Sequence, residues 1–237
     1  MDAESSGWPF DLGFPDVEWA MQIAVRYDKQ ALPTHLEVCA AAAKAVVGVL
    51  ADPRATGDGP WAAQVQHWRH GRIRKLVRRA RGLRWEEVQE LPGISVRAGW
   101  QDRAQVRAFV PAPARPLPPE LDRLQVSGTH FPDDVEGREE PPQEHAVPLI
   151  TIALTPHAVL STGKAAAQCG HAAQLAWEAL TRTQPEVARR WHAEGARVRV
   201  VQPDVAGWRA LAAAPVRVVD AGLTEVDGPT ESARAWW

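Results

Sequence analysis

The chain has 237 residues, of which 45% are hydrophobic and 24% charged, so it has the composition of a globular protein with one large domain or two small ones. Its formal net charge is −2, so the overall charge gives no support for a nucleic-acid partner. Only a local cluster of basic residues could indicate one. Two cysteines, Cys39 and Cys169, are too few for a disulfide scaffold. The N-terminal residues lack the apolar segment of a signal peptide, and no apolar run is long enough to span a bilayer. We therefore expect a cytoplasmic protein with no membrane partner.

The first predicted elements are a strand, MQIAVRY (21–27), and an alanine-rich helix that contains Cys39. A basic stretch follows, with eight cations and no acid between Arg69 and Arg84. Taken alone, GRIRKLVRRARGLR (71–84) would be a basic helix, but a repeat described below favours a strand and a turn.

In that strand, Arg72 and Arg74 would share one face and Lys75 would point to the other, while Arg78 and Arg79 would enter the turn. Such a surface could hold the phosphates of an RNA stem without reading its bases. The alternative is a solvated patch balanced by the acidic residues 133–140. The candidate RNA-binding residues are Arg72, Arg74, Lys75, Arg78 and Arg79.

The middle of the chain is rich in proline, with nine of the 20 prolines between Pro111 and Pro148. It also contains the acidic run DDVEGREE (133–140). This composition predicts a linker over residues 112–147, with a possible short strand at LDRLQVSG (121–128).

The second half begins with a buried strand, LITIALT (149–155), and a helix from about Gly163 to Leu180 that Ser161 or Thr162 caps. A second helix, a strand, a short helix and two strands complete it, at residues 185–195, 196–202, 204–214, 216–222 and 232–237. This order predicts an α/β fold with a mixed four-stranded sheet and helices on both faces.

The two halves resemble each other. In the second half, Trp191, Trp208, Pro215 and Ala221-Gly222 occur at the same separations as Trp68, Trp85, Pro92 and Ala98-Gly99 in the first, always 123 positions apart. We interpret this as a tandem duplication, with one copy at 20–111 and the other at 148–237. The two copies are expected to pack as an intramolecular pseudo-dimer in place of a homodimer.

The stretch STGKAAAQCGHAA (161–173) carries the candidate chemistry, because Lys164, Gln168 and His171 lie on one face of a helix. A lysine in the first helical turn opposes the helix dipole, so an anion that it binds would explain it, and a solvated lysine is the alternative. Gln168 could hold a water or a carbonyl, or be an ordinary polar residue of the helix face. His171 could accept a proton from water, or be hydrogen-bonded at a helix–sheet junction.

The second half contains the motifs Gly163-Lys164, Ala166-Ala167-Gln168, His171-Ala172 and Asp220-Ala221-Gly222-Leu223-Thr224. In these motifs, and in their order, it resembles the type 2 peptidyl-tRNA hydrolases. Where that family has Arg-x-Asp-Leu, this half reads TPHA (155–158). The first half keeps Arg26-Tyr27-Asp28 but lacks the other motif residues, and is interpreted as a degenerate copy without a site of its own.

The resemblance implies hydrolysis of the ester bond between peptide and tRNA, with peptidyl-tRNA or another tRNA as the partner and no cofactor. The implied catalytic residues are Lys164, Gln168, His171, Asp220 and Thr224. No metal is expected, because His157, His171 and His192 lack the spacing of a metal site. The alternative is a weak or inactive homologue that acts as an RNA-binding or assembly module, which the missing Arg-x-Asp favours.

Overall fold

The computed structural model describes residues 17–126, 128–133, 150–220 and 228–237, and they form an α/β fold with two mixed sheets. The elements of the first half are β1 (Trp19–Arg26), α1 (His35–Ala51), α2 (Ala62–His70), β2 (Lys75–Ala80), α3 (Leu83–Glu87), β3 (Gly93–Ala98), β4 (Ala104–Phe109), β5 (Ala112–Pro113) and α4 (Pro119–Asp122), with 3-10 turns at Pro53–Ala55, Val88–Glu90 and Trp100–Asp102. Those of the second half are β6 (Ile150–Leu154), α5 (Thr162–Thr183), α6 (Pro185–Ala193), β7 (Val198–Val201), α7 (Val205–Ala210), β8 (Val216–Asp220) and β9 (Thr230–Trp236).

The two sheets have the same topology. Their strand orders are β2-β1-β4-β3, with β5 paired to β1, and β7-β6-β9-β8. In each sheet the first strand pairs in parallel with the second and antiparallel with the fourth, which pairs antiparallel with the third. The parallel pairs open with Lys75 and Val198, which are 123 positions apart, as in the sequence repeat. This layout is compatible with a tandem pseudo-dimer.

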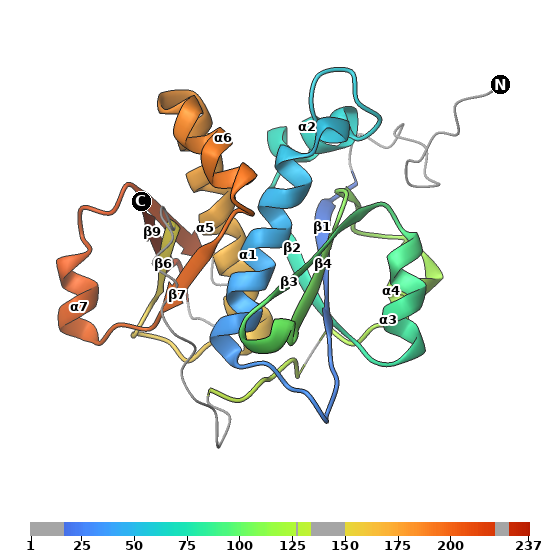
Figure 1. The fold of residues 1–237 in the computed structure, drawn as a ribbon, viewed down its shortest axis with the longest axis horizontal. Coiled ribbons are helices and arrows are strands. Elements are labelled where there is room, and N and C mark those ends of the chain that lie inside the picture. Colours follow the sequence, from blue (N-terminus) through green and yellow to red (C-terminus); the bar gives the residue numbers. More distant parts are fainter. Residues whose placement is uncertain (1–16, 127, 134–149, 221–227) are drawn as a thin grey trace.

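Helices α1 and α5 lie between the two sheets and pack against each other (Figure 1). Both begin at a hydroxyl cap: Thr34 accepts a hydrogen bond from the Glu37 amide, and Ser161 accepts one from the Lys164 amide. Their buried faces are rich in alanine, which lets neighbouring elements approach closely because alanine has no side chain beyond Cβ. Cys39 and Cys169 are both free and buried.

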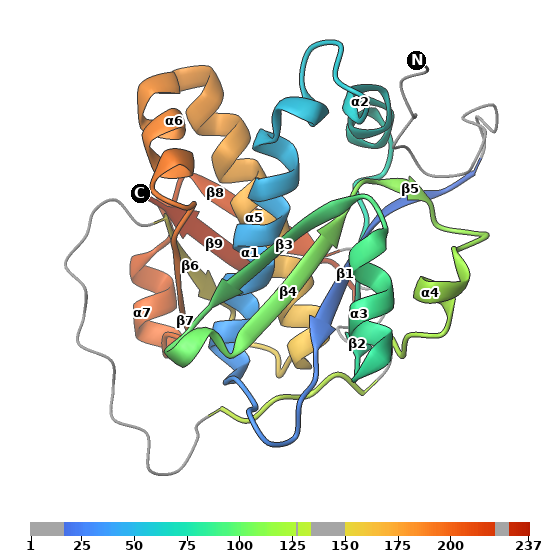
Figure 2. The same cartoon turned by 45° about the vertical axis from the view of Figure 1, so that its right-hand side comes forward.

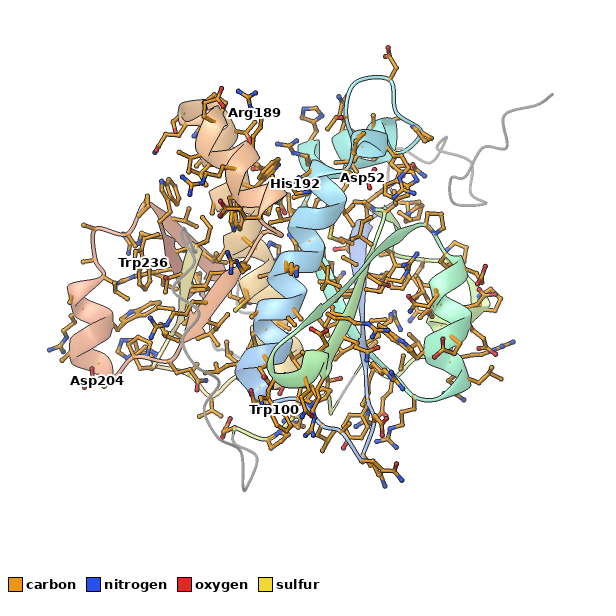
Figure 3. The ribbon with its side chains drawn as sticks, in the orientation of Figure 1. Asp52, Trp100, Arg189, His192, Asp204 and Trp236 are labelled. Carbon is orange, nitrogen blue, oxygen red and sulfur yellow. The ribbon has the colours of Figure 1, made fainter. Side chains whose placement is uncertain are left out.

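A second contact between the halves lies at the C-terminal end of α1. Helix α6 contacts α1, and His192 and Asp52 lie near each other where α6 meets the C-terminal end of α1 (Figure 3). The core is therefore continuous across the halves rather than divided into two.

Helices also cover the outer faces of the sheets, as α3 does for the first and α7 for the second (Figures 1 and 2). Each carries a buried tryptophan, Trp85 and Trp208. The other repeated pair, Trp68 and Trp191, donates ring N–H bonds to carbonyls six residues downstream, at 3.3 and 2.8 Å. All four tryptophans are buried, at 0%, 5%, 1% and 4% exposure for Trp68, Trp85, Trp191 and Trp208.

The basic stretch forms strand β2, as the repeat predicted and its composition did not. Arg72 and Arg74 are exposed and Lys75 is buried, as predicted, but β2 begins at Lys75, so the two arginines precede the strand and do not share one of its faces. The expectation that Arg78 and Arg79 enter a turn is wrong, because both lie within β2.

The strand predicted at residues 121–128 is also wrong. Pro118 and Pro119 instead start the helical turn α4, where proline needs no backbone N–H, and only an isolated bridge joins Gln125 to Arg79. Leu121 and Leu124 are buried against the first half, so this part of the predicted linker packs on the fold. No helix in the described ranges is long and apolar enough to cross a membrane.

The pairing of β8 with β9 includes a charge cluster with a testable acid response. Arg234 and Arg217 both donate to the Glu231 carboxylate and lower its pKa from 4.5 to about 2. A depressed pKa contributes stability above about pH 4.5, and that stability is lost as the pH falls toward 2. Glu231→Gln is therefore expected to lower the free energy of unfolding by about 1 kcal/mol at pH 7, since the cluster is partly exposed, and by almost nothing near pH 2.

Urea unfolding at several pH values measures this difference. The matched control is Glu186→Gln, which removes an exposed carboxylate paired with Arg189 on α6. A Glu231→Gln penalty that stays constant from pH 7 to pH 2 would contradict the assignment to the ionised carboxylate.

Candidate active site

A cleft of about 410 Å³ lies where α5 meets the end of β8 and the start of β2. Its lining comes from both halves of the chain. Helix α5 and strand β8 supply Lys164, Gln168, His171 and Asp220, and the first half supplies Arg74 and Lys75. The cleft therefore contains four of the five predicted catalytic residues. The fifth, Thr224, lies outside the described residues.

The centre of the cleft is an ion pair between Lys164 and Asp220, whose Nζ and Oδ2 atoms are 2.5 Å apart. Gln168 donates a second hydrogen bond from its amide nitrogen to the same carboxylate oxygen. The Ser232 hydroxyl donates to the Gln168 carbonyl oxygen at 2.9 Å and so fixes the orientation of the amide. The Asp220 carboxylate is thus held by a cation and an oriented amide while 8% of the residue remains exposed.

The local sequence explains this arrangement. The Ser161 cap starts α5 so that Lys164 falls in the first turn, and Gln168 follows one turn later on the same face. Asp220 is the last residue of β8, which is an edge strand of the second sheet, and α5 packs against this strand. Ser232 was not predicted from the sequence, because nothing in the closing strand distinguishes it from other small residues facing the helix.

His171 lies one further turn along α5 and meets a second cation. Its Nδ1 atom is 3.2 Å from Lys75 Nζ. Burial, and then the charges of Lys75 and Lys164, hold the pKa of His171 well below 6.5. The imidazole is therefore neutral at neutral pH and a weak base, which suits a hydrogen-bonding role better than proton acceptance.

The predicted RNA-binding residues separate into two groups. Arg72 and Arg74 are exposed, and Arg74 also forms an ion pair with Glu18. Lys75 and Arg78 are only 5% and 4% exposed, so neither presents its charge on the surface.

Arg78 and Arg79 are both engaged within the first half. Arg78 donates to the Gln22 side chain at 2.8 Å and to the Leu121 and Leu124 carbonyls at 3.3 and 3.2 Å. Arg79 is half-buried and donates to the Gln125 side chain and the Gly128 carbonyl. These contacts hold the segment around α4 against β2, a structural role that local charge could not reveal.

Other polar groups lie apart from this cleft. Arg26 and Asp28, the Arg-x-Asp pattern of the first half, form a 3.7 Å ion pair and line a different pocket beside Gln101 and Asp102. Within the described ranges, no group of three histidine, cysteine, aspartate or glutamate residues could hold a metal ion.

The fold and the cleft define an α/β protein in which a partly exposed lysine in the first turn of a helix pairs with a buried aspartate. Residues 157–233, from the start of the α5 region to β9, match the model of the family described as Peptidyl-tRNA hydrolase PTH2. The match contains Lys164, Gln168, His171 and Asp220 and lies wholly in the second half, where the resemblance was predicted. Comparisons with curated proteins and with solved structures found no match.

Proposed function

We propose that the protein hydrolyses the ester bond between peptide and tRNA in peptidyl-tRNA, at the cleft of the second half. One observation carries the proposal: the segment that matches the hydrolase family brings Lys164, Gln168 and Asp220 into direct contact at an open cleft. Asp220 is more than 50 positions from Lys164 and Gln168 in the sequence, and the three residues meet because α5 packs against β8.

The contacts suggest a chemical role for each residue of the cleft. Water attacks the ester carbonyl and transfers a proton toward the Asp220 carboxylate, which Lys164 and Gln168 hold in place. The Lys164 ammonium group stabilises the oxyanion that forms. The bond between the acyl carbon and the ribose oxygen then breaks, and Asp220 passes the proton it received to the ribose oxygen, which leaves free tRNA and a peptide acid that loses its remaining proton to solvent. Thr224 is proposed as a further substrate contact.

We also propose that the first half, residues 20–111, is a degenerate copy of the second, residues 148–237, joined by the linker at 112–147. The identical strand orders and pairings support this, as do the matching hydrogen bonds of Trp68 and Trp191. Fusion raises the effective concentration of one copy for the other, so a pseudo-dimer would replace a homodimer.

The direct test is release of peptide from peptidyl-tRNA by the purified protein, next to an active hydrolase as the positive control. Release at a rate well above the uncatalysed reaction is the expected result. Binding of tRNA without release would instead support the alternative of an inactive RNA-binding module, for which the TPHA sequence at 155–158 is the motivating observation.

A salt titration tests the RNA-binding surface. Arg74 and, from the other half, Arg217 line the cleft, and Arg72 is exposed two residues before Arg74. If they contact phosphates, the double variant Arg72→Ala/Arg74→Ala should weaken tRNA binding and reduce the slope of log affinity against log salt by about one to two.

The matched control is Arg182→Ala/Arg189→Ala, which removes two exposed arginines from α5 and α6. Equal slopes for the wild type and the Arg72/Arg74 variant would assign RNA binding to the second half alone. Arg78 is left out of this test because its removal would break the contacts to α4.

A further inference from the structure

We propose that Lys75, from the half that lacks its own motif, is a positioning residue of the cleft, so that the active site is built from both halves. The inference rests on the proposed hydrolase function and deepens it. It concerns the lysine that opens β2, the edge strand of the first sheet, where α5 of the second half lies against that strand.

The Lys75 side chain leaves its own sheet and ends among residues of α5. Its Nζ atom lies 2.5 Å from Gln174 Oε1 and 3.2 Å from His171 Nδ1. On the side of its own half, the ammonium group lies 4.8 Å from the centre of the Trp68 ring. Lys75 also lines the cleft that contains Lys164 and Asp220.

A glycine in α5 makes room for this lysine. A Cβ atom at Gly170 would lie 3.1 Å from Lys75 Cδ and 3.1 Å from Val46 Cγ2 of α1. Glycine within a helix costs about 1 kcal/mol relative to alanine, so its presence beside His171 needs a packing reason. The passage of the Lys75 stem over Gly170, together with the close approach of α1, is that reason.

A purely structural cation at the position of Lys75 would have a large unfavourable desolvation free energy. None of its described contacts is a carboxylate: Glu178, the nearest acid in its network, instead accepts from Gln174 at 3.0 Å and pairs with Arg69 at 2.9 Å. Burial holds the pKa of Lys75 well below its ordinary value, and Glu178 offsets this only in part. An apolar side chain of the same length would fill this space without that desolvation cost.

The role that we propose for Lys75 is to fix the tautomer and the orientation of the His171 imidazole. Because an ammonium group has no acceptor, Lys75 must donate across its 3.2 Å contact with Nδ1, and this selects the His171 tautomer that carries its proton on Nε2. Among the described residues, Nε2 has no hydrogen-bond partner, so the N–H remains available to the substrate. Lys75 therefore makes His171 an oriented hydrogen-bond donor. A hydrogen bond to one ring nitrogen fixes the tautomer and orientation of metal-binding histidines in the same way.

The test compares Lys75→Met with Lys44→Met, a matched change of a partly exposed lysine on α1. The first readout is the His171 imidazole, followed by NMR titration. The charged groups that line the cleft around it are Lys75, Lys164, Asp220, Arg74 and Arg217, with Glu178 one turn further along α5. Removing Lys75 is expected to raise the His171 pKa and to yield a mixture of tautomers, whereas Lys44→Met should change neither.

The second readout is hydrolysis. Lys75→Met is expected to lower kcat about tenfold with little change in tRNA affinity, and to leave the melting temperature equal to or above that of the wild type. A lysine needed only for folding would lower the melting temperature instead. Wild-type values of kcat and of the His171 pKa in Lys75→Met would overturn the inference.

The two proposals can fail separately. If the wild-type protein releases no peptide, the hydrolase proposal fails, while NMR still decides whether Lys75 controls His171. If the wild type is active and Lys75→Met is equally active with an unchanged pH profile, only the composite site fails. Should Lys75→Met not fold, Lys75→Gln removes the same charge with a polar side chain and is judged by the same two readouts.

Discussion

Replacing Lys164 by alanine is expected to lower kcat/KM for peptidyl-tRNA at least about tenfold while the protein remains folded, because a lost charge-assisted contact can exceed ~1.4 kcal/mol. The variant removes the cation that is proposed to stabilise the oxyanion, and with it the ion pair to the Asp220 carboxylate. Asp220→Asn is expected to have a loss of similar size, because an amide cannot take a proton from water. Steady-state hydrolysis with circular dichroism as the check on folding measures both.

The pair should behave as one unit. Since each residue holds the other, the double variant Lys164→Ala/Asp220→Asn is expected to lose much less than the product of the two single losses. Arg190→Ala, which breaks the exposed ion pair with Glu194 on α6, is the matched control and should retain wild-type activity. Full activity in Lys164→Ala would remove this lysine from the mechanism and leave its ion pair with Asp220 a structural contact.

The sequence predicted those parts of the site that belong to one helix. The spacing of Lys164, Gln168 and His171 fixes their common face, because helical periodicity is local, and the resemblance to a family added Asp220. Strand β2 was predicted only because residues 71–84 align with the second half at a separation of 123. Their own composition favoured a helix, and packing at a sheet edge overrode it.

Contacts between the halves could not be predicted in this way. Lys75 and His171 are 96 positions apart, and they meet only because α5 packs against β2. Charge clustering placed Lys75 with the surface arginines, although the strand alternation already pointed it to the other face. Gly170 was the one available signal, since a glycine inside an alanine-rich helix indicates that another group passes close by.

The last expected result concerns how far the halves depend on each other. Trp68 and Trp191 occupy equivalent positions, are 0% and 1% exposed, and each donates a hydrogen bond to a carbonyl of its own half. Truncating a buried tryptophan to alanine costs about 3–5 kcal/mol. Because α1 and α5 share one core, either variant is expected to shift a single cooperative unfolding transition to lower urea concentration.

The two variants differ in what they should do to the site. Trp68→Ala also removes the ring beneath Lys75, so under conditions where the protein is folded it should reduce hydrolysis although Trp68 lies outside the family-matched segment. Trp237→Ala, at a partly exposed tryptophan that packs against the core, is the control and should lower stability less than either of these variants. Two separate unfolding transitions, with Trp68→Ala affecting only one of them and leaving hydrolysis intact, would show that the halves fold independently. In that case the first half would contribute nothing to the cleft, and neither the shared core nor a role for Lys75 could stand.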